Sequence, residues 1–86
     1  MTETLWYVYL LECGDGSFYC GIAKDVVRRL AEHESGNGAR YTRGRGPLKI
    51  VWQSVQPLTH SDALKLEIQI KAMSREQKKA FMNSLS

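Results

Sequence analysis

Two tyrosines, an arginine and a histidine follow one another near the start of this 86-residue chain. Tyr9 and Tyr19 are ten positions apart. Arg29 follows ten positions after Tyr19, and His33 stands four positions further on. A guanidinium matches two oxygens of a phosphate at once, and a histidine could bind phosphate or transfer a proton. If the fold brings these groups together, their chemistry suits a phosphate.

Each of these residues also has a structural explanation. Tyrosines are common in strands, where they fill half-buried faces. An arginine at a helix edge usually lays its stem on apolar surface, and a histidine at a helix end can lie near the last carbonyls. Gly21 favours a functional interpretation, because a glycine inside a strand costs stability and often marks the close approach of a ligand or of another backbone.

Glu67 is the remaining candidate, and it lies in the largely apolar segment LKLEIQIKAM. A carboxylate that is partly buried among apolar side chains needs a partner or a metal ion. The alternative is an ion pair with Lys71, because residues at i and i+4 of a helix commonly pair on its surface. Spacing alone favours the ion pair.

A hairpin is predicted to carry the two tyrosines. Residues 5–12 are rich in aromatic and branched side chains, which favour a strand. Both faces of this strand are largely apolar, so we expect it to be central in its sheet and covered on both sides. The sequence Gly14-Asp15-Gly16 is a turn signal, and residues 18–22 are predicted to form the second strand.

The length of the turn decides whether the tyrosines share a face. A two-residue turn would place Tyr19 on the face opposite Tyr9. A three-residue loop, with Gly16 in the left-handed region, pairs Tyr9 with Gly21 and Leu11 with Tyr19. The tyrosines are then diagonal neighbours on one face. We predict the three-residue loop, because a shared tyrosine site requires it, and we expect Gly21 to leave room for a phosphate.

Residues 26–34 are predicted to form a helix. Asp25 is a suitable N-cap, and the Ser-Gly-Asn-Gly sequence that follows suits a helix end. We expect Arg29 and His33, at i and i+4, to line one edge of the buried stripe. The stripe itself is predicted to consist of Val26, Val27, Leu30 and Ala31.

The rest of the chain completes a single domain, residues 1–86. A basic loop spans residues 39–47, a third strand residues 48–55, and two helices residues 61–73 and 75–83. Each of these helices follows a capping-box sequence, the first beginning at Thr59 and the second at Ser74. The element order β-β-α-β-α-α predicts an α/β fold, with a small three-stranded, mostly antiparallel sheet flanked by helices.

Composition excludes several classes of protein. Two cysteines are too few for a disulfide scaffold and suggest free thiols in a reducing compartment. No apolar run is long enough to cross a bilayer, so we expect a cytoplasmic protein without a membrane partner. There is no zinc-ligand spacing, no P-loop and no nucleophile elbow. The net charge of +3 and the pI near 9.0 permit a nucleic-acid partner.

Taken together, these residues resemble the GIY-YIG nuclease domain. The two signature triplets correspond to Tyr7-Val8-Tyr9 and Tyr19-Cys20-Gly21. Arg29 and His33 match the arginine and histidine of the following helix, and Glu67 matches the family's metal-binding glutamate. The resemblance runs from about residue 5 to residue 81. Within the family, the chain is similar to the small stand-alone branch. It is also similar to the catalytic subunit of structure-selective endonucleases that cut branched DNA.

The chain departs from the family pattern at three positions. Tyr7 replaces the first glycine of the signature, and Cys20 replaces a branched residue. Neither position supplies chemistry. Ile22 stands where DNA-repair members often carry a lysine, and Lys24 is a candidate substitute.

The resemblance implies metal-dependent hydrolysis of DNA phosphodiester bonds, with branched or damaged DNA as a candidate substrate. It assigns one Mg²⁺ or Mn²⁺ to Glu67, stabilisation of phosphate charge to Arg29, and the attacking water to Tyr9 or Tyr19. A tyrosine base would need its pKa lowered from about 10 by Arg29, the metal and His33. The expected DNA contacts are Lys24, Arg40, Tyr41, Arg43 and Arg45.

Two other functions remain open at this stage. The same fold could bind nucleic acid without cutting it, or act as a subunit that a protein partner activates and targets. A protein–protein adaptor with vestigial tyrosines is the third class. The sequence does not distinguish Tyr9 from Tyr19 as base, and it gives no oligomeric state.

Overall fold

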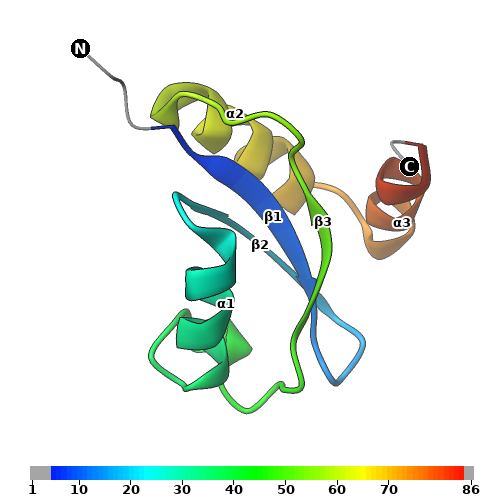
Figure 1. Ribbon diagram of the computed structural model, residues 1–86. Coiled ribbons are helices and arrows are strands. Elements are labelled where there is room, and N and C mark those ends of the chain that lie inside the picture. Colours follow the sequence, from blue (N-terminus) through cyan, green and yellow to red (C-terminus); the bar gives the residue numbers. More distant parts are fainter. Residues whose placement is uncertain (1–4, 85–86) are drawn as a thin grey trace.

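The computed structural model describes residues 5–84 and has the predicted α/β architecture (Figure 1). Its elements follow the predicted order, with one additional 3₁₀ turn in the basic loop. They are β1 (Tyr7–Glu12), β2 (Phe18–Ala23), α1 (Val26–Glu34), the 3₁₀ turn Arg40–Thr42, β3 (Lys49–Gln53), α2 (His60–Lys71) and α3 (Arg75–Ser84).

The strand β1 is the centre of the molecule. It pairs antiparallel with β2 on one side and with β3 on the other, so the sheet order is β2-β1-β3. Tyr9 and Leu11 pack toward α1, whereas Val8 and Leu10 pack toward α2 and α3. All four side chains are almost completely buried. The prediction of a central strand covered on both sides is therefore confirmed, and β2 and β3 are the two outer strands.

The hairpin has the predicted register. Tyr9 pairs with Gly21, and Leu11 pairs with Tyr19. The loop is closed by a hydrogen bond from the backbone N–H of Gly16 to the carbonyl of Cys13, at 2.9 Å. Gly16 has φ = +85°, which a residue with a side chain rarely adopts. The three-residue loop therefore places both tyrosines on the face that α1 covers.

The third strand is shorter than predicted. It ends at Gln53, and Val55, which we expected inside it, is 93% exposed. The pairing with β1 shifts register between Leu10 and Leu11. Such a β-bulge explains the imperfect alternation of the sequence, because it reorients the side chains that follow it.

The helix α1 has the predicted ends but a partly different buried face. Asp25 caps it, since its carboxylate accepts a hydrogen bond from the backbone N–H of Arg28 at 3.1 Å. The predicted stripe is wrong at Val27, which is 74% exposed, and at Ala31, which is also exposed. Val26 is buried and Leu30 packs against the same cluster, as predicted, and His33 is buried with them. The sheet therefore meets the helix face on which Arg29 and His33 lie.

The two later helices begin at the predicted caps. Thr59 accepts a hydrogen bond from the N–H of Asp62 at 3.2 Å. Ser74 and Gln77 form a reciprocal capping box with bonds of 3.1 and 2.8 Å. None of the helices within residues 5–84 combines the length and apolarity that a bilayer crossing requires.

Candidate active site

The two tyrosine side chains are neighbours, Tyr9 on the central strand β1 and Tyr19 on the outer strand β2. The centroids of the Tyr9 and Tyr19 rings are 6.4 Å apart. Tyr9 is buried, with 1% of its surface exposed, and Tyr19 is partly exposed. Because β2 is an edge strand of the sheet that residues 5–84 form, side chains from both helical layers can approach its outer side. This edge is the place where a shared site is possible.

Gly21 makes room for a tyrosine and not for a phosphate. A Cβ atom at this position would lie 2.5 Å from the hydroxyl oxygen of Tyr9 and 3.1 Å from the ring of Tyr19. The expectation that Gly21 leaves space for a ligand is therefore wrong. The space belongs to the phenol of Tyr9, which must cross the neighbouring strand to reach α1.

His33 holds the hydroxyl of Tyr9. The Nε2 atom of His33 lies 2.8 Å from that hydroxyl, and the histidine is 1% exposed. On the other side of the ring, Nδ1 accepts a hydrogen bond from the backbone N–H of Ala39 at 3.0 Å. An amide N–H can only donate, so Nδ1 carries no proton and Nε2 does. His33 therefore donates to the Tyr9 oxygen, and the hydroxyl proton of Tyr9 points away from the ring.

The loop after α1 fixes His33 in this orientation. Thr42 lies with its hydroxyl 3.2 Å from Nδ1, and the same hydroxyl donates to the carbonyl of Ala39 at 2.8 Å. A side chain at Gly38 would overlap the histidine ring. Our expectation that His33 could touch phosphate is not supported by this geometry, because the imidazole is enclosed. It acts on Tyr9 instead.

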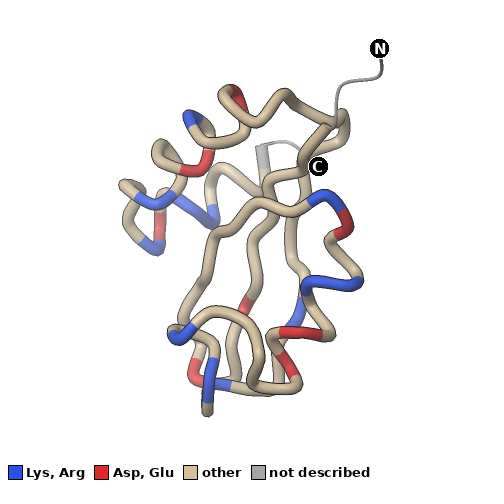
Figure 2. Tube along the Cα trace, turned by 90° about the vertical axis from the view of Figure 1, so that its left-hand side faces the viewer, with Lys and Arg blue, Asp and Glu red and all other residues tan. Residues whose placement is uncertain are grey.

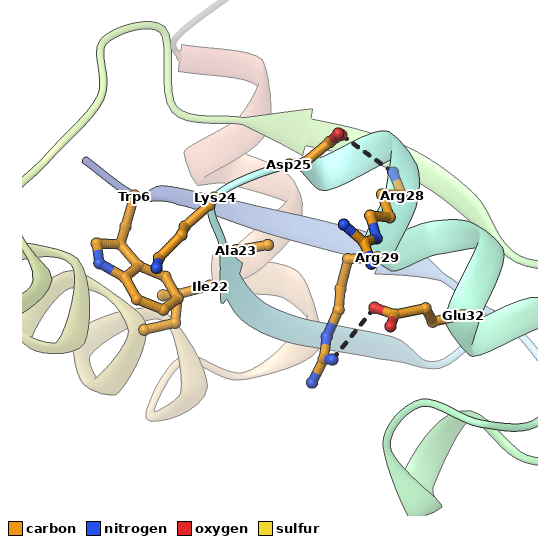
Figure 3. A pocket seen from close by; sticks show the side chains of 8 residues that line it. All are labelled: Trp6, Ile22, Ala23, Lys24, Asp25, Arg28, Arg29 and Glu32. Atoms are coloured by element: carbon orange, nitrogen blue, oxygen red, sulfur yellow. Dashed lines mark hydrogen bonds and ion pairs between the residues drawn. The ribbon is translucent and has the colours of Figure 1, made fainter. Parts of the chain in front are cut away.

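Arg29 extends from α1 over the edge of the sheet. Its guanidinium pairs with Glu32 at 3.3 Å, and 42% of its side chain is exposed (Figure 3). Its charge is close enough to both tyrosines to oppose the rise in their pKa values. Arg29 therefore lies on the predicted face, beside Tyr9 and Tyr19, with donors available to an anion.

Burial raises the pKa of both tyrosines. For Tyr9 the rise is large and is caused first by loss of water around the phenolate and then by the neighbouring Tyr19. For Tyr19 burial also dominates, whereas Lys71 and Arg29 oppose it. A tyrosine that acts as a base needs a lowered pKa, and the side chains around Tyr9 and Tyr19 do not provide it. Any deprotonation of a tyrosine must await further positive charge at the site.

Glu67 reaches the same edge from the opposite helical layer. Only 15% of its side chain is exposed, and its carboxylate lies 3.4 Å from the ammonium of Lys71. Its negative charge raises the pKa of Tyr19 and also that of the buried thiol of Cys20, which lies at about 12 mainly because of burial. The ion pair with Lys71 that the spacing favours is present, and the carboxylate is also partly buried.

A metal ion at Glu67 would need most of its ligands from water or from a substrate. Residues 5–84 contain no cluster of three or more histidine, cysteine, aspartate or glutamate side chains that could enclose an ion. Mg²⁺ often uses only one or two carboxylates and takes its other ligands from water and substrate phosphate. Glu67 is therefore suited to a Mg²⁺ or Mn²⁺ held jointly with a substrate.

The basic loop covers the outer face of Tyr19. Tyr41 stacks on Tyr19 with a centroid distance of 5.9 Å, and the guanidinium of Arg45 lies 4.3 Å from the centre of the Tyr41 ring. Arg45 also forms an ion pair with Asp15 in the hairpin loop. Arg40 and Arg43 are exposed, so they are better placed than Arg45 to contact a phosphate backbone.

Positive charge is spread along this part of the molecule. Figure 2 shows lysines and arginines on both helical layers and on the loop, and not on one helix alone. Lys24 lies at the far end of β2, with its ammonium 5.1 Å from the Trp6 ring. Lys71 was predicted only as a surface partner of Glu67, but its charge also opposes the rise in the pKa of Tyr19. Its position four residues after Glu67 was the sequence feature that could have placed it near the candidate site.

Comparison with known proteins supports one family. The model of the family described as GIY-YIG catalytic domain matches residues 5–80. A UPF0213 protein of Cupriavidus pinatubonensis is 52% identical over 83 residues, which cover 96% of this chain and 91% of the relative. A UPF0213 protein of Vibrio cholerae is 47% identical over 81 residues, covering 94% and 80%.

Two solution NMR structures resemble the fold. The UPF0213 protein BH0048 from Bacillus halodurans has a TM-score of 0.57 at 45% identity, with 91% of this chain and 82% of that chain covered. The protein EF2693 from E. faecalis has a TM-score of 0.65 at 37% identity, with 98% and 88% covered. Both matches extend over nearly all of the present chain.

Proposed function

The chain belongs to the GIY-YIG catalytic domain family, a nuclease family, and from this premise we propose that it is an endonuclease that hydrolyses DNA phosphodiester bonds with Mg²⁺ or Mn²⁺. The observation that carries the proposal is that Arg29 of α1 and Glu67 of α2 both lie close enough to Tyr19 for their charges to shift the pKa of its phenol. These two residues come from different helical layers, so the arrangement is not a by-product of one amphipathic helix.

Glu67 is proposed to hold the metal, with Lys71 moving aside. When bound, the ion supplies Lewis-acid stabilisation of the leaving oxygen and the phosphate charge. Lys71 is more exposed than Glu67, at 52% against 15% of the side chain, so it can leave without uncovering the core. Its ammonium then remains near the phosphate that has entered.

Arg29 and the tyrosines are proposed to handle the phosphate and the water. Arg29 donates to the non-bridging oxygens, whose charge grows in the transition state. A tyrosine hydroxyl orients the attacking water. His33 keeps the Tyr9 oxygen in place through the 2.8 Å hydrogen bond, so it is a positioning residue. Because burial raises both tyrosine pKa values, orientation precedes any proton transfer.

The proposed substrate is branched, flapped or damaged DNA. The exposed Arg40 and Arg43 supply phosphate contacts on the loop side of the site, and Tyr41 offers a ring for stacking. A protein partner that supplies targeting is compatible with so small a domain. The buried thiols of Cys13 and Cys20 suit a reducing compartment such as the cytoplasm.

Cleavage of a panel of DNA substrates tests the proposal. The purified protein should cut at least one branched, flapped or linear DNA with Mg²⁺ or Mn²⁺ and should stop in EDTA. Glu67→Ala and Arg29→Ala should lose about 100-fold or more in rate. The matched control is Glu76→Gln, which changes an exposed carboxylate of α3 and should leave the rate unchanged. Equal residual activity in all four proteins would indicate a contaminant and contradict the proposal.

The second candidate is a domain that binds nucleic acid without cutting it until a partner acts. The ion pair between Glu67 and Lys71 favours it, because the carboxylate that would hold a metal already has a cation. This function predicts DNA binding that weakens steeply with salt and no metal-dependent cleavage by the isolated chain. An adaptor without nucleic-acid function predicts neither property.

A further inference from the structure

A groove opens beside the candidate active site, at the end of β2 (Figure 3). It has a volume of about 350 Å³ and lies between the indole of Trp6 and the first turns of α1. Its floor is formed by Ile22 and Ala23, and Lys24, Arg28 and Arg29 supply positive charge. Arg29 belongs both to this groove and to the tyrosine site. A ligand in the groove therefore continues directly into the site.

Trp6 provides a fixed aromatic wall. Its backbone forms two hydrogen bonds with Leu58, both of 2.7 Å. Its ring also contacts the ring of His60, with a centroid distance of 4.8 Å. The indole is partly exposed, and the ammonium of Lys24 lies over it. His60 thus contacts the Trp6 indole, and the flexible side chain of Lys24 covers one of its faces.

The charges of the groove are unequally engaged. Glu32 pairs with Arg29, and the carboxylate of Asp25 caps α1. Lys24 and Arg28 have no ion-pair partner among residues 5–84, and both are exposed. The groove therefore combines an aromatic face with two cations that no carboxylate of residues 5–84 pairs with. That combination is typical of sites that bind single-stranded nucleic acid, where a base stacks and phosphates bind basic side chains.

We propose that this groove binds an unpaired nucleotide of the substrate strand, one step away from the phosphate that Arg29 contacts. The base stacks on Trp6, and Lys24 leaves the indole to bind a backbone phosphate together with Arg28. The inference rests on the proposed function and adds a substrate class to it: strands with unpaired bases next to the cleaved bond. A continuous duplex does not fit, because its bases are already stacked on one another.

Tryptophan fluorescence tests this binding directly and without metal. The chain has two tryptophans, and Trp52 lies on β3, away from the residues that line the groove, against Phe81 of α3. In a Trp52→Phe background, Trp6 is the only tryptophan. Titration with a short oligothymidylate in EDTA should quench its fluorescence, and a blunt duplex of equal length should quench it far less.

Substitutions then assign the contacts. Trp6→Ala should weaken oligonucleotide binding about tenfold or more, as measured by anisotropy of a labelled strand, and Trp6→Phe should retain most of the affinity. Lys24→Met and Arg28→Met should each weaken binding and lower its salt dependence by about one counterion. Lys79→Met, at an exposed position of α3, is the matched control and should change neither quantity.

The outcomes separate this inference from the proposed function. Oligonucleotide binding by anisotropy with unchanged Trp6 fluorescence overturns the groove, whatever the cleavage assay gives. Equal quenching by the duplex overturns the preference for unpaired bases. Quenching by the single strand without cleavage of any substrate retains the groove and contradicts the nuclease. Because the fluorescence is measured with Trp6 intact, a variant that fails to fold does not decide the result.

Discussion

The two faces of β1 are equally buried but hold different chemistry. Toward α2 and α3, the strand packs Val8 and Leu10 against Ala63 and Ile70, all of them apolar. Toward α1 it packs Tyr9, whose hydroxyl is bonded to His33. The face toward α2 and α3 is thus lined by apolar side chains, whereas the face toward α1 encloses a hydrogen-bonded tyrosine–histidine pair. Within residues 5–84, every buried side-chain nitrogen and oxygen atom has a hydrogen-bond partner.

This difference separates stability from chemistry. Apolar burial stabilises without needing partners. A buried polar pair gives little net stability, and it is costly when one partner is lost. The α1 face therefore positions functional groups, and the α2 face supplies much of the folding free energy. Glu67 belongs to α2, on the apolar side of the sheet, and its charge acts on Tyr19, which packs on the α1 side.

The largest effect is expected from Tyr9→Phe. The substitution removes the hydroxyl that His33 holds and leaves the buried Nε2–H without a partner. We expect the cleavage rate to fall roughly 10²–10⁴-fold, with a loss of about 1–3 kcal/mol in unfolding free energy. Tyr7→Phe is the control on the same strand and face. Equal rates for the two variants would remove Tyr9 from the mechanism.

The next effect is on stability and comes from the opposite face. Leu10 is completely buried, so Leu10→Ala should lower the unfolding free energy by about 2–5 kcal/mol in urea titrations. The cleavage rate per folded molecule should not change. Val55→Ala, at a position that is 93% exposed, should stay within about 0.5 kcal/mol of the wild type. A folded Leu10→Ala protein without activity would show that the faces are not separable.

A smaller effect is expected from Gly21→Ala. The added Cβ would lie 2.5 Å from the Tyr9 hydroxyl oxygen, so the phenol must shift and its bond to His33 must lengthen. We expect a loss of about 1–3 kcal/mol together with reduced cleavage. At Gly46 an added Cβ meets no atom within 4 Å, and Gly46→Ala should have little effect. A neutral Gly21→Ala would contradict the tight fit of Tyr9.

The smallest effect is a pH dependence from the α1 face. Burial, and then the charge of Arg29, lowers the pKa of His33 below its ordinary value of 6.5. The unfolded chain therefore binds a proton first as pH falls below about 6.5, and stability decreases until the folded pKa is reached. His33→Gln should flatten the fall in unfolding free energy between pH 7 and 5, whereas His60→Gln should retain it. An equal slope in the His33 variant would contradict a neutral, enclosed imidazole.

Local interactions made part of the fold predictable. The odd hairpin loop follows from Gly16, which tolerates φ = +85°, and the loop sets the tyrosine register. The caps at Asp25, Thr59 and Ser74 depend on atoms within three residues of each cap. These features need no knowledge of the rest of the chain, and all of them are confirmed.

Packing between distant segments was harder to predict from the sequence. The face of α1 that meets the sheet includes the polar His33 and omits Val27, so hydrophobicity alone predicted Val26 and Leu30 correctly but missed the histidine. His33 is buried because Ala39 and Thr42 satisfy it, and Gly38 leaves it space. A histidine that the loop supplies with partners behaves like a core residue, which the spacing of apolar residues does not reveal.

The sequence by itself determined the hairpin, its register and the identity of the residues that could do chemistry. Only the tertiary structure decided how they meet: Gly21 accommodates Tyr9, His33 bonds to Tyr9, and Glu67 of α2 lies close enough to Tyr19 to raise the pKa of its phenol. The physical reason is the distance along the chain over which each kind of interaction acts. Turn and cap preferences arise from neighbouring atoms, whereas burial, charge and free space at a site depend on every element that packs around it.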